Sequence, residues 1–472
     1  MIPFPGQATT LRSHALDDLT SWGRTAHAKS LRYPITSLES LQEAFALAGM
    51  IQQPIIACGA GHSYNDASLL DNGIVLDMRP MNRCLSWNAH TGVITVEPGT
   101  TLEAIYRLTL PDGWWFPVTP TASEATIGGC VAMNVHGRNA WKRGALGEHV
   151  TEIVLMTASG QVMIVRPDEE LFMAAVGGAG LLGIITQITM QMVRVPSAFI
   201  AVQTNRITNL DAMFAAFDEH AADADFLEGW IDGFASGAAM GRGTFTAATY
   251  QSIGKPYRPQ RSGSSLSVVQ AAAAIGSRIV VRPWARVLAR SGLAALYHTS
   301  APARGVLQQT ASLPAFTYHH PAEYQVMRAC MPHGVFVFQP FVPASEARRL
   351  FEVFLKLSHE AALTPLWCIM KRHRRDPFPL SCQVDGYSLE LNYRVTPHNR
   401  RRIEELLCFM TEAALDAGSR FYIAKDQLLN ADQFRRCIGT STAAWFHRLR
   451  RMHDPQGRIQ SRLAHRLFPE EV

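Results

Sequence analysis

Three segments near the start of the chain contain too many small residues to form ordinary helix or strand interiors. They span residues 58–66, 125–137 and 177–183, and the last holds four glycines within seven residues. Glycine weakens a helix interior by about 1 kcal/mol relative to alanine. Such segments suit sharp turns and backbone that approaches a ligand closely. A tight turn alone explains 58–66 and some of the glycines of 177–183, and a small-residue helix packed on a sheet explains 125–137.

The rest of the composition is that of a folded protein. The chain has 472 residues, 47% of them hydrophobic, and a mean hydropathy of zero, which argues against disorder and predicts two or three domains. Lys and Arg number 44 and Asp and Glu 39, an excess too small to predict nucleic-acid binding. The eight cysteines are scattered without a C-x-x-C pair, so we expect reduced thiols and no metal. No signal peptide or membrane span is recognisable, which predicts a cytoplasmic protein.

Local patterns predict an α+β fold in two parts, with a different pattern of strands and helices before and after about residue 195. In the first part we expect strands at 54–57, 73–78, 92–96 and 184–193, a helix from Leu102, and a hairpin of 150–157 with 162–165. In the second part we expect strands at 227–231, 244–250, 334–342, 365–371 and 387–395. Helices there are predicted to begin at Asn209, Ser345 and Thr396-Pro397.

Residues 251–312 show little helix or strand pattern and are rich in Ser, Gly, Pro and Arg, which predicts an irregular lid. Arg278, Arg282, Arg286 and Arg290 recur every four residues, and a helix would place them on one stripe. Such a stripe fits peripheral contact with an anionic membrane, and equally the solvated face of a lid.

Taken together, the three small-residue segments resemble the vanillyl-alcohol oxidase family, whose members carry a PCMH-type FAD-binding domain. The likeness continues through the segments 136–139 and 144–150, Gln339 with 341–343, and Lys371. It ends with 422–426 and 454–464, so it covers nearly the whole chain except 251–312. Within the family, the similarity is greatest to the branch that oxidises decaprenylphosphoryl ribose.

The resemblance implies a two-part FAD-binding domain around an α+β substrate domain with an antiparallel sheet. The expected parts are 1–196 for the FAD-binding domain and 197–413 for the substrate domain. Residues 414–472 would return to the FAD-binding domain.

The same resemblance implies that FAD is the cofactor and indicates which residues bind it. The expected FAD-binding residues are Gly59, Ala60, Gly61, His62, Ser63, Asn65, Val118, Thr119, Ser123, Thr126, Ile127, Gly128, Gly129, Cys130, Asn134, His136, Gly137, Gly180, Gly183, Ile184 and Tyr422.

Lys425, Tyr422 and His136 match catalytic positions of the family, and Gln339, Lys371, Glu390 and Lys425 match positions that face the substrate. A lysine beside the reacting hydroxyl can orient it, or can act as a base if burial lowers its pKa. The alternative for Lys425 is an ordinary surface lysine.

Two residues depart from the branch that oxidises decaprenylphosphoryl ribose. His62 stands in a Gly-x-Gly-His-Ser loop like that of aldonolactone and alditol oxidases, in which the histidine is bonded covalently to the flavin. Glu390 stands where mycobacterial members carry a cysteine, and a carboxylate there favours a sugar hydroxyl or an amine over an anionic group.

The resulting prediction is FAD-dependent oxidation of a secondary alcohol on a sugar or sugar-lipid. The keto product would pass to a short-chain reductase partner, and the protein could sit peripherally at the inner face of the cell membrane. One alternative is an aldonolactone or alditol oxidase with covalent flavin that uses oxygen. Another is a flavin-free binding protein on the same fold.

Overall fold

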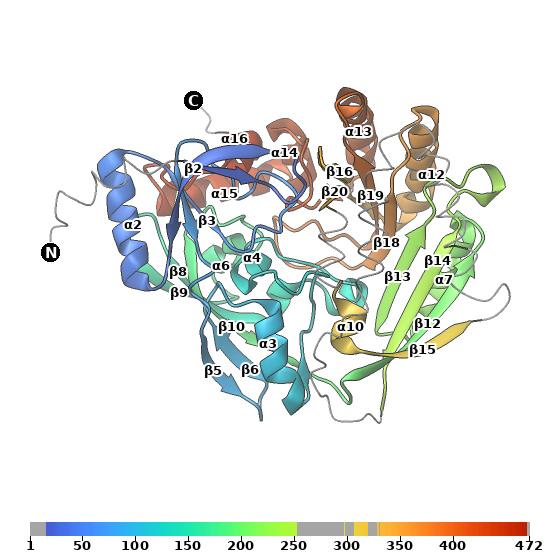
Figure 1. Cartoon of the computed structure of the whole chain (residues 1–472), viewed down its shortest axis with the longest axis horizontal. Helices are drawn as coiled ribbons and strands as arrows, with labels where there is room; N and C mark the ends of the chain where they lie inside the picture. The colour runs from blue at the N-terminus through green and yellow to red at the C-terminus, as the bar shows by residue number, and fades with distance from the viewer. Residues whose placement is uncertain (1–15, 253–296, 298–305, 320–327, 330, 470–472) are drawn as a thin grey trace.

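The computed structural model describes residues 16–252, 297, 306–319, 328–329 and 331–469 (Figure 1). The arginine stripe at 278–290 and most of the predicted lid lie outside these residues. The last part of that predicted lid is wrong, because Leu307–Ser312 forms strand β15 at the edge of a sheet. No helix among the described residues combines the length and apolar character needed to cross a membrane.

The first sheet has four strands in the order β1-β2-β4-β3, of which β2, β4 and β3 run parallel. The strands are β1 (Asp17–Thr20), β2 (His27–Pro34), β3 (Ile55–Cys58) and β4 (Ile74–Asp77). Helix α2 (Leu38–Ile51) connects β2 to β3, and Ser37 caps its first turn. The four residues of β4 are all buried, as expected for a central strand of a parallel sheet. The glycine-rich residues 59–63 follow directly after β3.

The second sheet has five antiparallel strands in the order β5-β6-β10-β8-β9. They are β5 (Cys84–Asn88), β6 (Val93–Val96), β10 (Ile184–Gln191), β8 (Val150–Met156) and β9 (Val162–Val165). The predicted hairpin of β8 and β9 is confirmed. The short elements around this sheet are α3 (Leu102–Thr109), η1 (Leu110–Asp112), β7 (Trp114–Trp115), α4 (Ile127–Ala132), α5 (Ala140–Arg143), η2 (Leu146–His149), α6 (Glu170–Ala175) and β11 (Val193–Arg194).

The third sheet has nine strands, with β15-β12-β14-β13-β18-β19-β17-β20 in order and β16 paired to β19. Its strands are β12 (Phe199–Ile207), β13 (Phe226–Ile231), β14 (Gly243–Tyr250), β15, β16 (Val335–Phe338), β17 (Pro340–Pro343), β18 (Trp367–His373), β19 (Gly386–Arg394) and β20 (Arg420–Phe421). Helices α7 (Leu210–His220) and α12 (Ala344–Glu360) pack on it, and α13 (Arg400–Asp416) packs on α12. Elements η3 (Gly237–Ala239) and α10 (Leu313–Thr317) are short.

The alternation of β18 and β19 gives this sheet two different faces. Lys371 lies opposite Ser388 and Ile369 opposite Glu390, so the polar side chains of both strands share one face. Met370 and Leu389, also paired, belong to the other face and are fully buried. The mixed α/β architecture with antiparallel sheets agrees with the predicted fold class.

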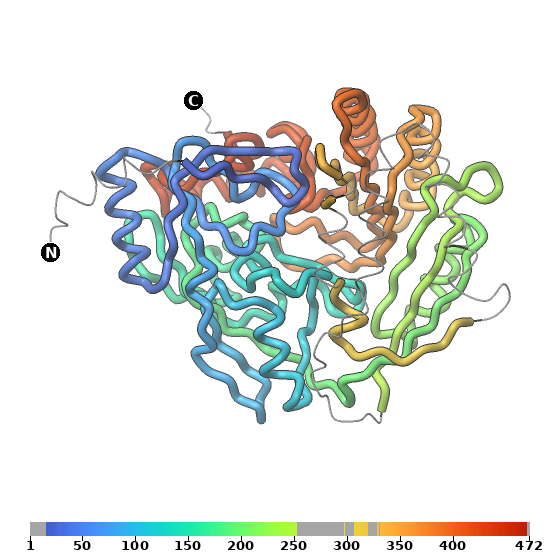
Figure 2. The backbone as a smooth tube through the Cα atoms, in the orientation of Figure 1, coloured from blue at the N-terminus to red at the C-terminus, as the bar shows by residue number. Residues whose placement is uncertain are grey.

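The C-terminal segment runs back to the first sheet (Figures 1 and 2). It comprises α14 (Ala431–Ile438), α15 (Thr440–His453) and α16 (Arg462–Leu467). Ile459 forms a bridge to Ile55 of β3, and Arg466 on α16 forms an ion pair with Asp66 at 2.8 Å. The Tyr64 N–H donates to the Ala424 carbonyl at 2.9 Å, which places 422–426 beside the loop that follows β3.

Four predicted elements needed correction. The strand expected at 184–193 ends at Gln191, and Val193–Arg194 is the separate strand β11, which pairs with β7. The strand expected at 334–342 is two strands, since the chain breaks at Gln339 before Pro340, which has no N–H to donate. Helix α12 begins at Ala344, so Ser345 is inside the helix and does not cap it. Helix α13 begins at Arg400 instead of Thr396-Pro397, because the Asn399 side chain accepts from the Thr396 N–H and holds 396–399 in a turn.

Candidate active site

A cavity lies where the three small-residue segments meet the polar face of the nine-stranded sheet. Fifteen of the predicted FAD-binding residues line it: Gly59, Ala60, Gly61, His62, Ser63, Thr119, Thr126, Gly128, Gly129, Cys130, His136, Gly137, Gly180, Gly183 and Tyr422. Lys371 and Lys425 line it as well. The folding of the chain therefore brings together segments from both of its ends.

Eight predicted residues are buried but do not line this cavity: Asn65, Val118, Ser123, Ile127, Asn134, Ile184, Gln339 and Glu390. Two of them hold neighbouring backbone in place. The Asn65 amide donates to the carbonyls of Ile423 and Asp426, which fixes the turn that carries Lys425. The Asn134 side chain accepts from the Gly147 N–H at 3.0 Å and donates to Asp376 at 3.2 Å.

The Lys425 ammonium is paired with a carboxylate at the edge of the cavity. Its Nζ donates to Glu390 Oε2 at 2.5 Å, and Asn392 donates to the other oxygen of Glu390 at 3.1 Å. Burial by itself would raise the pKa of Glu390, but Lys425 and Lys371 outweigh burial and lower it. Glu390 is therefore ionised at neutral pH, and Lys425 is not the surface lysine of the alternative interpretation, since its side chain is 18% exposed.

A second charged group lies next to Lys371. The Glu228 carboxylate, on β13, accepts from Arg138 Nε at 3.0 Å and lies 3.8 Å from Lys371 Nζ. Burial lowers the pKa of Lys371, and the nearby Lys425 adds to that effect, while Glu228 opposes it. Sequence analysis missed Arg138 and Glu228 as site residues. The signal for Glu228 was a lone carboxylate within the otherwise apolar strand 227–231.

His136 sits in an aromatic cluster at the inner end of the cavity. Its ring meets Phe341, His373 and Tyr422 edge to face, at centroid distances of 5.2, 5.3 and 5.1 Å. Burial lowers the pKa of His136 well below its usual value, and the nearby His373 and Lys371 lower it further. Burial also raises the pKa of Tyr422 far above its ordinary value. His136 and Tyr422 are therefore both uncharged at neutral pH.

Several lining residues were not predicted, although most are neighbours of predicted ones. Tyr64 follows Ser63 directly, and the Lys425 ammonium lies 5.6 Å from the centre of its ring. Met133 and Ala132 follow the predicted 126–130 run, and Ile185 follows Ile184. Extending each predicted segment by one to three residues would have found them.

Comparison with known proteins identifies the segment that builds most of this cavity. Residues 33–166 match the family model described as FAD binding domain. The chain is 25% identical to decaprenylphosphoryl-beta-D-ribose oxidase of Mycolicibacterium smegmatis over 464 residues, covering 95% of this chain and 97% of that protein. The protein is an FAD-dependent oxidoreductase.

Other relatives align with this oxidoreductase over less than half of their own length. L-gulonolactone oxidase of Bos taurus is 27% identical over 44% of this chain and 47% of that protein. D-arabinono-1,4-lactone oxidase of Yarrowia lipolytica is 24% identical over 47% of this chain and 42% of that protein. These similarities confirm the predicted family resemblance and the FAD cofactor, and the flavin-free alternative is wrong.

The cavity of the oxidoreductase fits a bound FAD because backbone, not side chains, forms much of its wall. A Cβ added to Gly128 would lie 2.6 Å from the Pro98 ring, so α4 can approach the 98–99 turn only with glycine there. Gly61 and Gly180 have φ of +71° and +74°, and an added Cβ at either would meet open space. Small residues therefore keep this space free for the dinucleotide.

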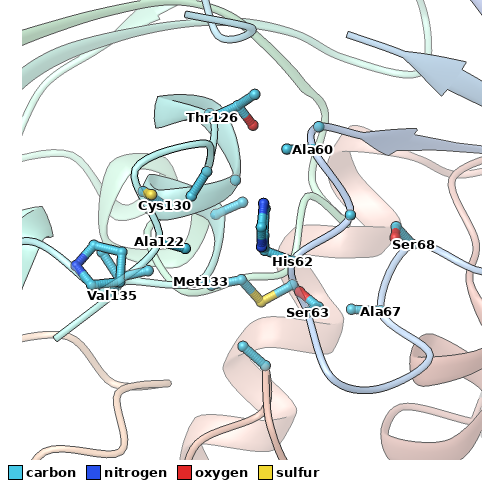
Figure 3. Close-up of a pocket in the computed structure, with 18 of the residues that line it drawn as sticks. Ala60, His62, Ser63, Ala67, Ser68, Ala122, Thr126, Cys130, Met133 and Val135 are labelled. Atoms are coloured by element: carbon cyan, nitrogen blue, oxygen red, sulfur yellow. The ribbon is translucent and has the colours of Figure 1, made fainter. Parts of the chain in front are cut away.

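His62 of the oxidoreductase projects from the loop after β3 toward the segment carrying Cys130 and Met133 (Figure 3). Its side chain lines the cavity, and burial lowers its pKa. The imidazole is therefore neutral at pH 7, which is the form with a nucleophilic nitrogen.

Proposed function

We propose that this oxidoreductase converts a secondary alcohol on a sugar or sugar-lipid to a ketone. The observation that carries the proposal is the Lys425–Glu390 pair, with an N···O distance of 2.5 Å, beside a cavity that fits FAD. A cation that lines the cavity can bind a hydroxyl group, and the anion held behind it can take up the proton that the hydroxyl loses. Neither group is needed to build the FAD site itself, which is formed mainly by backbone and small residues.

Oxidation of an alcohol removes the hydroxyl proton and a hydride from the same carbon. FAD, when bound, supplies the acceptor for the hydride. The Lys425 ammonium donates a hydrogen bond to the hydroxyl oxygen and stabilises the negative charge that develops there. The ionised Glu390 carboxylate, which lies 2.5 Å from Lys425 Nζ, receives the proton by relay: Lys425 passes one of its protons to Glu390 and takes up the hydroxyl proton in exchange. His136 and Tyr422, both uncharged, line the cavity without adding charge near the cofactor.

The preferred substrate in this proposal is a ribose carried on a polyprenyl phosphate. The alignment to decaprenylphosphoryl-beta-D-ribose oxidase along almost the whole chain supports it. The ketone would then pass to a short-chain reductase. The peripheral membrane contact predicted from Arg278–Arg290 belongs to the same proposal, and vesicle flotation of wild type against a variant with all four arginines changed to glutamine tests it. Equal binding of both proteins to anionic vesicles contradicts that contact.

A free polyol or aldonolactone oxidised by oxygen is the second candidate. The observation that favours it is His62, which lines the cavity within a Gly-x-Gly-His-Ser loop. Glu390 also supports it, because a carboxylate in the site disfavours a substrate phosphate close to the reacting carbon. In this candidate His62 is bonded covalently to the flavin.

Anaerobic flavin bleaching measures substrate oxidation directly. The purified holoprotein is mixed with polyprenyl-phosphoryl ribose, with xylitol and with L-gulono-1,4-lactone, and absorbance near 450 nm is followed. Faster bleaching by the lipid-linked ribose supports the first candidate, and faster bleaching by xylitol or the lactone supports the second. If none of a wider series of sugars and polyols bleaches the flavin, the proposed function is wrong.

Acid precipitation decides the covalent link. A yellow pellet from wild type and a colourless pellet from His62→Ala are expected if His62 holds the flavin. A colourless wild-type pellet with a yellow supernatant would eliminate the link while leaving alcohol oxidation untouched.

A further inference from the structure

One arginine of the C-terminal segment connects two loops that line the cavity. Arg466, on α16, donates from Nε and Nη2 to the two carboxylate oxygens of Asp66, at 3.0 and 2.8 Å. Its Nη1 donates to Asp426 Oδ1 at 3.4 Å and to the Leu429 carbonyl at 2.7 Å, and Nη2 also donates to the Asp426 carbonyl at 3.3 Å. Because a guanidinium has five N–H groups, these five bonds use all of them.

The two carboxylates lie next to residues already assigned to the site. Asp66 follows His62 by four residues in the loop after β3, and Asp426 follows Lys425 directly. The Arg466 side chain is 19% exposed, and those of Asp66 and Asp426 are 14% and 9% exposed. Water and salt therefore screen this group of three charges little, and the bidentate bonds to Asp66 fix its geometry.

The loop after β3 has anchors that do not involve α16. The Trp22 N–H donates to the Ser63 carbonyl at 3.0 Å, and the Gly23 N–H donates to the Tyr64 carbonyl at 3.2 Å. Both donors lie in the connection between β1 and β2. The loop is therefore a fixed support for whatever is bonded to it.

The turn 422–426, which follows β20, takes its position from that loop. The Tyr64 N–H donates to the Ala424 carbonyl at 2.9 Å, and the Asn65 amide donates to the Asp426 carbonyl at 2.6 Å. Both bonds reach backbone carbonyls of the turn. The charged link through Arg466 reaches a side chain of the turn as well.

The Asp426 carboxylate joins this turn to α16. Its Oδ1 accepts from the N–H groups of Leu428 and Leu429, at 3.1 and 2.8 Å, and the same oxygen accepts from Arg466. Burial raises the pKa of Asp426, and Arg466 opposes that rise. The conformation of the chain directly after Lys425 therefore depends on the Arg466 guanidinium.

We propose that Arg466 is a positioning residue, which holds the turn 422–426 against the loop after β3 and so keeps the Lys425 ammonium on Glu390. This inference rests on the proposed alcohol oxidation, in which Lys425 and Glu390 move the hydroxyl proton. Arg466 does not line the cavity, so it acts through the turn. A reacting group displaced by about 1 Å can slow a reaction about 10²-fold, so a link behind the site matters to the rate.

Hydrogen exchange measured by mass spectrometry tests the positioning without any substrate. Arg466→Lys keeps a cation beside both carboxylates, but its three N–H donors cannot make five bonds. In the holoprotein we expect the amides of 423–429 to exchange about tenfold faster in Arg466→Lys than in wild type, with those of α13 and β10 unchanged. Equal exchange in both proteins overturns the proposal, and so does faster exchange throughout α13 and β10.

Stopped-flow reduction measures the effect on the reaction, with whichever of the lipid-linked ribose, xylitol or lactone bleaches the flavin. Arg466→Lys should reduce its flavin about tenfold more slowly, with FAD content unchanged and KM changed less than about threefold. Lys425→Ala combined with Arg466→Lys should be no slower than Lys425→Ala alone, because the arginine acts through the lysine. A wild-type rate in Arg466→Lys, or effects that multiply in the double variant, would overturn the proposal.

Two further variants separate this link from general stabilisation. Arg462→Lys is the matched control, because Arg462 lies one turn earlier on α16 and donates to both oxygens of Asp71, at 2.5 and 2.9 Å, away from the turn 422–426. It should reduce its flavin at the wild-type rate. Asp66→Asn weakens the other end of the link, leaves Arg466 paired with Asp426, and should slow reduction as Arg466→Lys does. Either variant behaving otherwise contradicts the proposal.

The two arms of this test fail separately. If wild type oxidises no alcohol at all, the proposed function is wrong, and hydrogen exchange still decides whether Arg466 holds the turn. If wild type oxidises an alcohol and exchange in 423–429 is the same in Arg466→Lys, the proposed function stands and the role of Arg466 is wrong.

Discussion

The two walls of the cavity are built on opposite principles. The cofactor wall uses backbone and small residues from three continuous segments: glycine at 59 and 128 lets the wall pack closely, and an added Cβ at 61 or 180 would meet open space. The substrate wall uses charged side chains from separate segments: Lys371 and Lys425 line the cavity, and Glu228 and Glu390 lie close to them from behind. Contacts made by backbone depend little on which side chains are present, so the cofactor wall tolerates substitution. Contacts made by side chains do not, so a single substitution in the substrate wall can change which substrate binds.

The largest expected effect concerns the substrate wall. Lys425→Ala should slow flavin reduction by about 10²–10⁴-fold while FAD stays bound, because the proton-transfer pair is lost and the cofactor wall is intact. Arg435→Ala on α14 is the control, since the Arg435 guanidinium is paired 3.4 Å from Asp432 on the same helix. Stopped-flow reduction at equal FAD content measures the rate. Wild-type reduction by Lys425→Ala would remove this residue from the mechanism.

A second prediction concerns the residue that joins the two walls. Asp376 follows β18 and accepts from Asn134 and from Ser381, at 3.2 and 2.7 Å. Burial raises the pKa of Asp376 to about 6 from the ordinary 3.8, so between these values the folded protein binds a proton that the unfolded chain has released. The free energy of unfolding therefore falls as pH rises from 4 to 6, by up to about 3 kcal/mol from this group.

Urea unfolding at pH 4.5 and pH 7 tests the Asp376 prediction. Asp376→Asn cannot ionise, so its stability should lack this part of the pH dependence, and wild type and variant should differ most in slope between pH 4 and 6. Asp385→Asn changes an exposed carboxylate of the same connection and serves as the control. Parallel pH profiles for wild type and Asp376→Asn would contradict the prediction.

The smallest expected effect concerns the cofactor wall. Gly128→Ala places a Cβ 2.6 Å from the rigid Pro98 ring and 3.0 Å from the Pro98 carbonyl oxygen, so α4 must move away from the 98–99 turn. We expect FAD affinity to fall about tenfold, in line with overpacking costs of 1–3 kcal/mol. The ratio of flavin to protein absorbance after purification measures it. Gly160→Ala is the control: its φ of +83° strains the β8–β9 turn, but an added Cβ meets nothing and the turn is outside the cavity, so FAD content should stay full.

The two walls differ in how far sequence could predict them. The segments 59–63 and 126–130 were found because consecutive small residues leave a signal within a short window. Gln339 and Glu390 were named by family resemblance alone, and the structure places them behind the lining residues. Glu228, Arg138 and His373 were missed, since a single polar residue in a strand reveals neither the face it lies on nor the partner it meets.

Boundary errors have local causes of a similar kind. The turn held by Asn399 delays α13 by four residues, and Pro340 divides one expected strand into β16 and β17. The first error comes from a side-chain hydrogen bond that the Asn399 turn makes, and the second from a backbone hydrogen bond that Pro340 cannot make. A pattern of hydrophobic residues reveals neither bond. The domain boundaries at 196 and 413 stay a prediction.

The sequence by itself determined many of the strands and helices, the glycine-rich backbone segments and, through family resemblance, the FAD cofactor. These depend on neighbouring residues, whose effect on backbone conformation is local. Only the tertiary structure decided that Lys425 meets Glu390, that Glu228 meets Lys371, and that Arg466 joins Asp66 to Asp426. Such contacts depend on strand register and on the return of the C-terminal segment to β3, which bring together residues far apart in the chain.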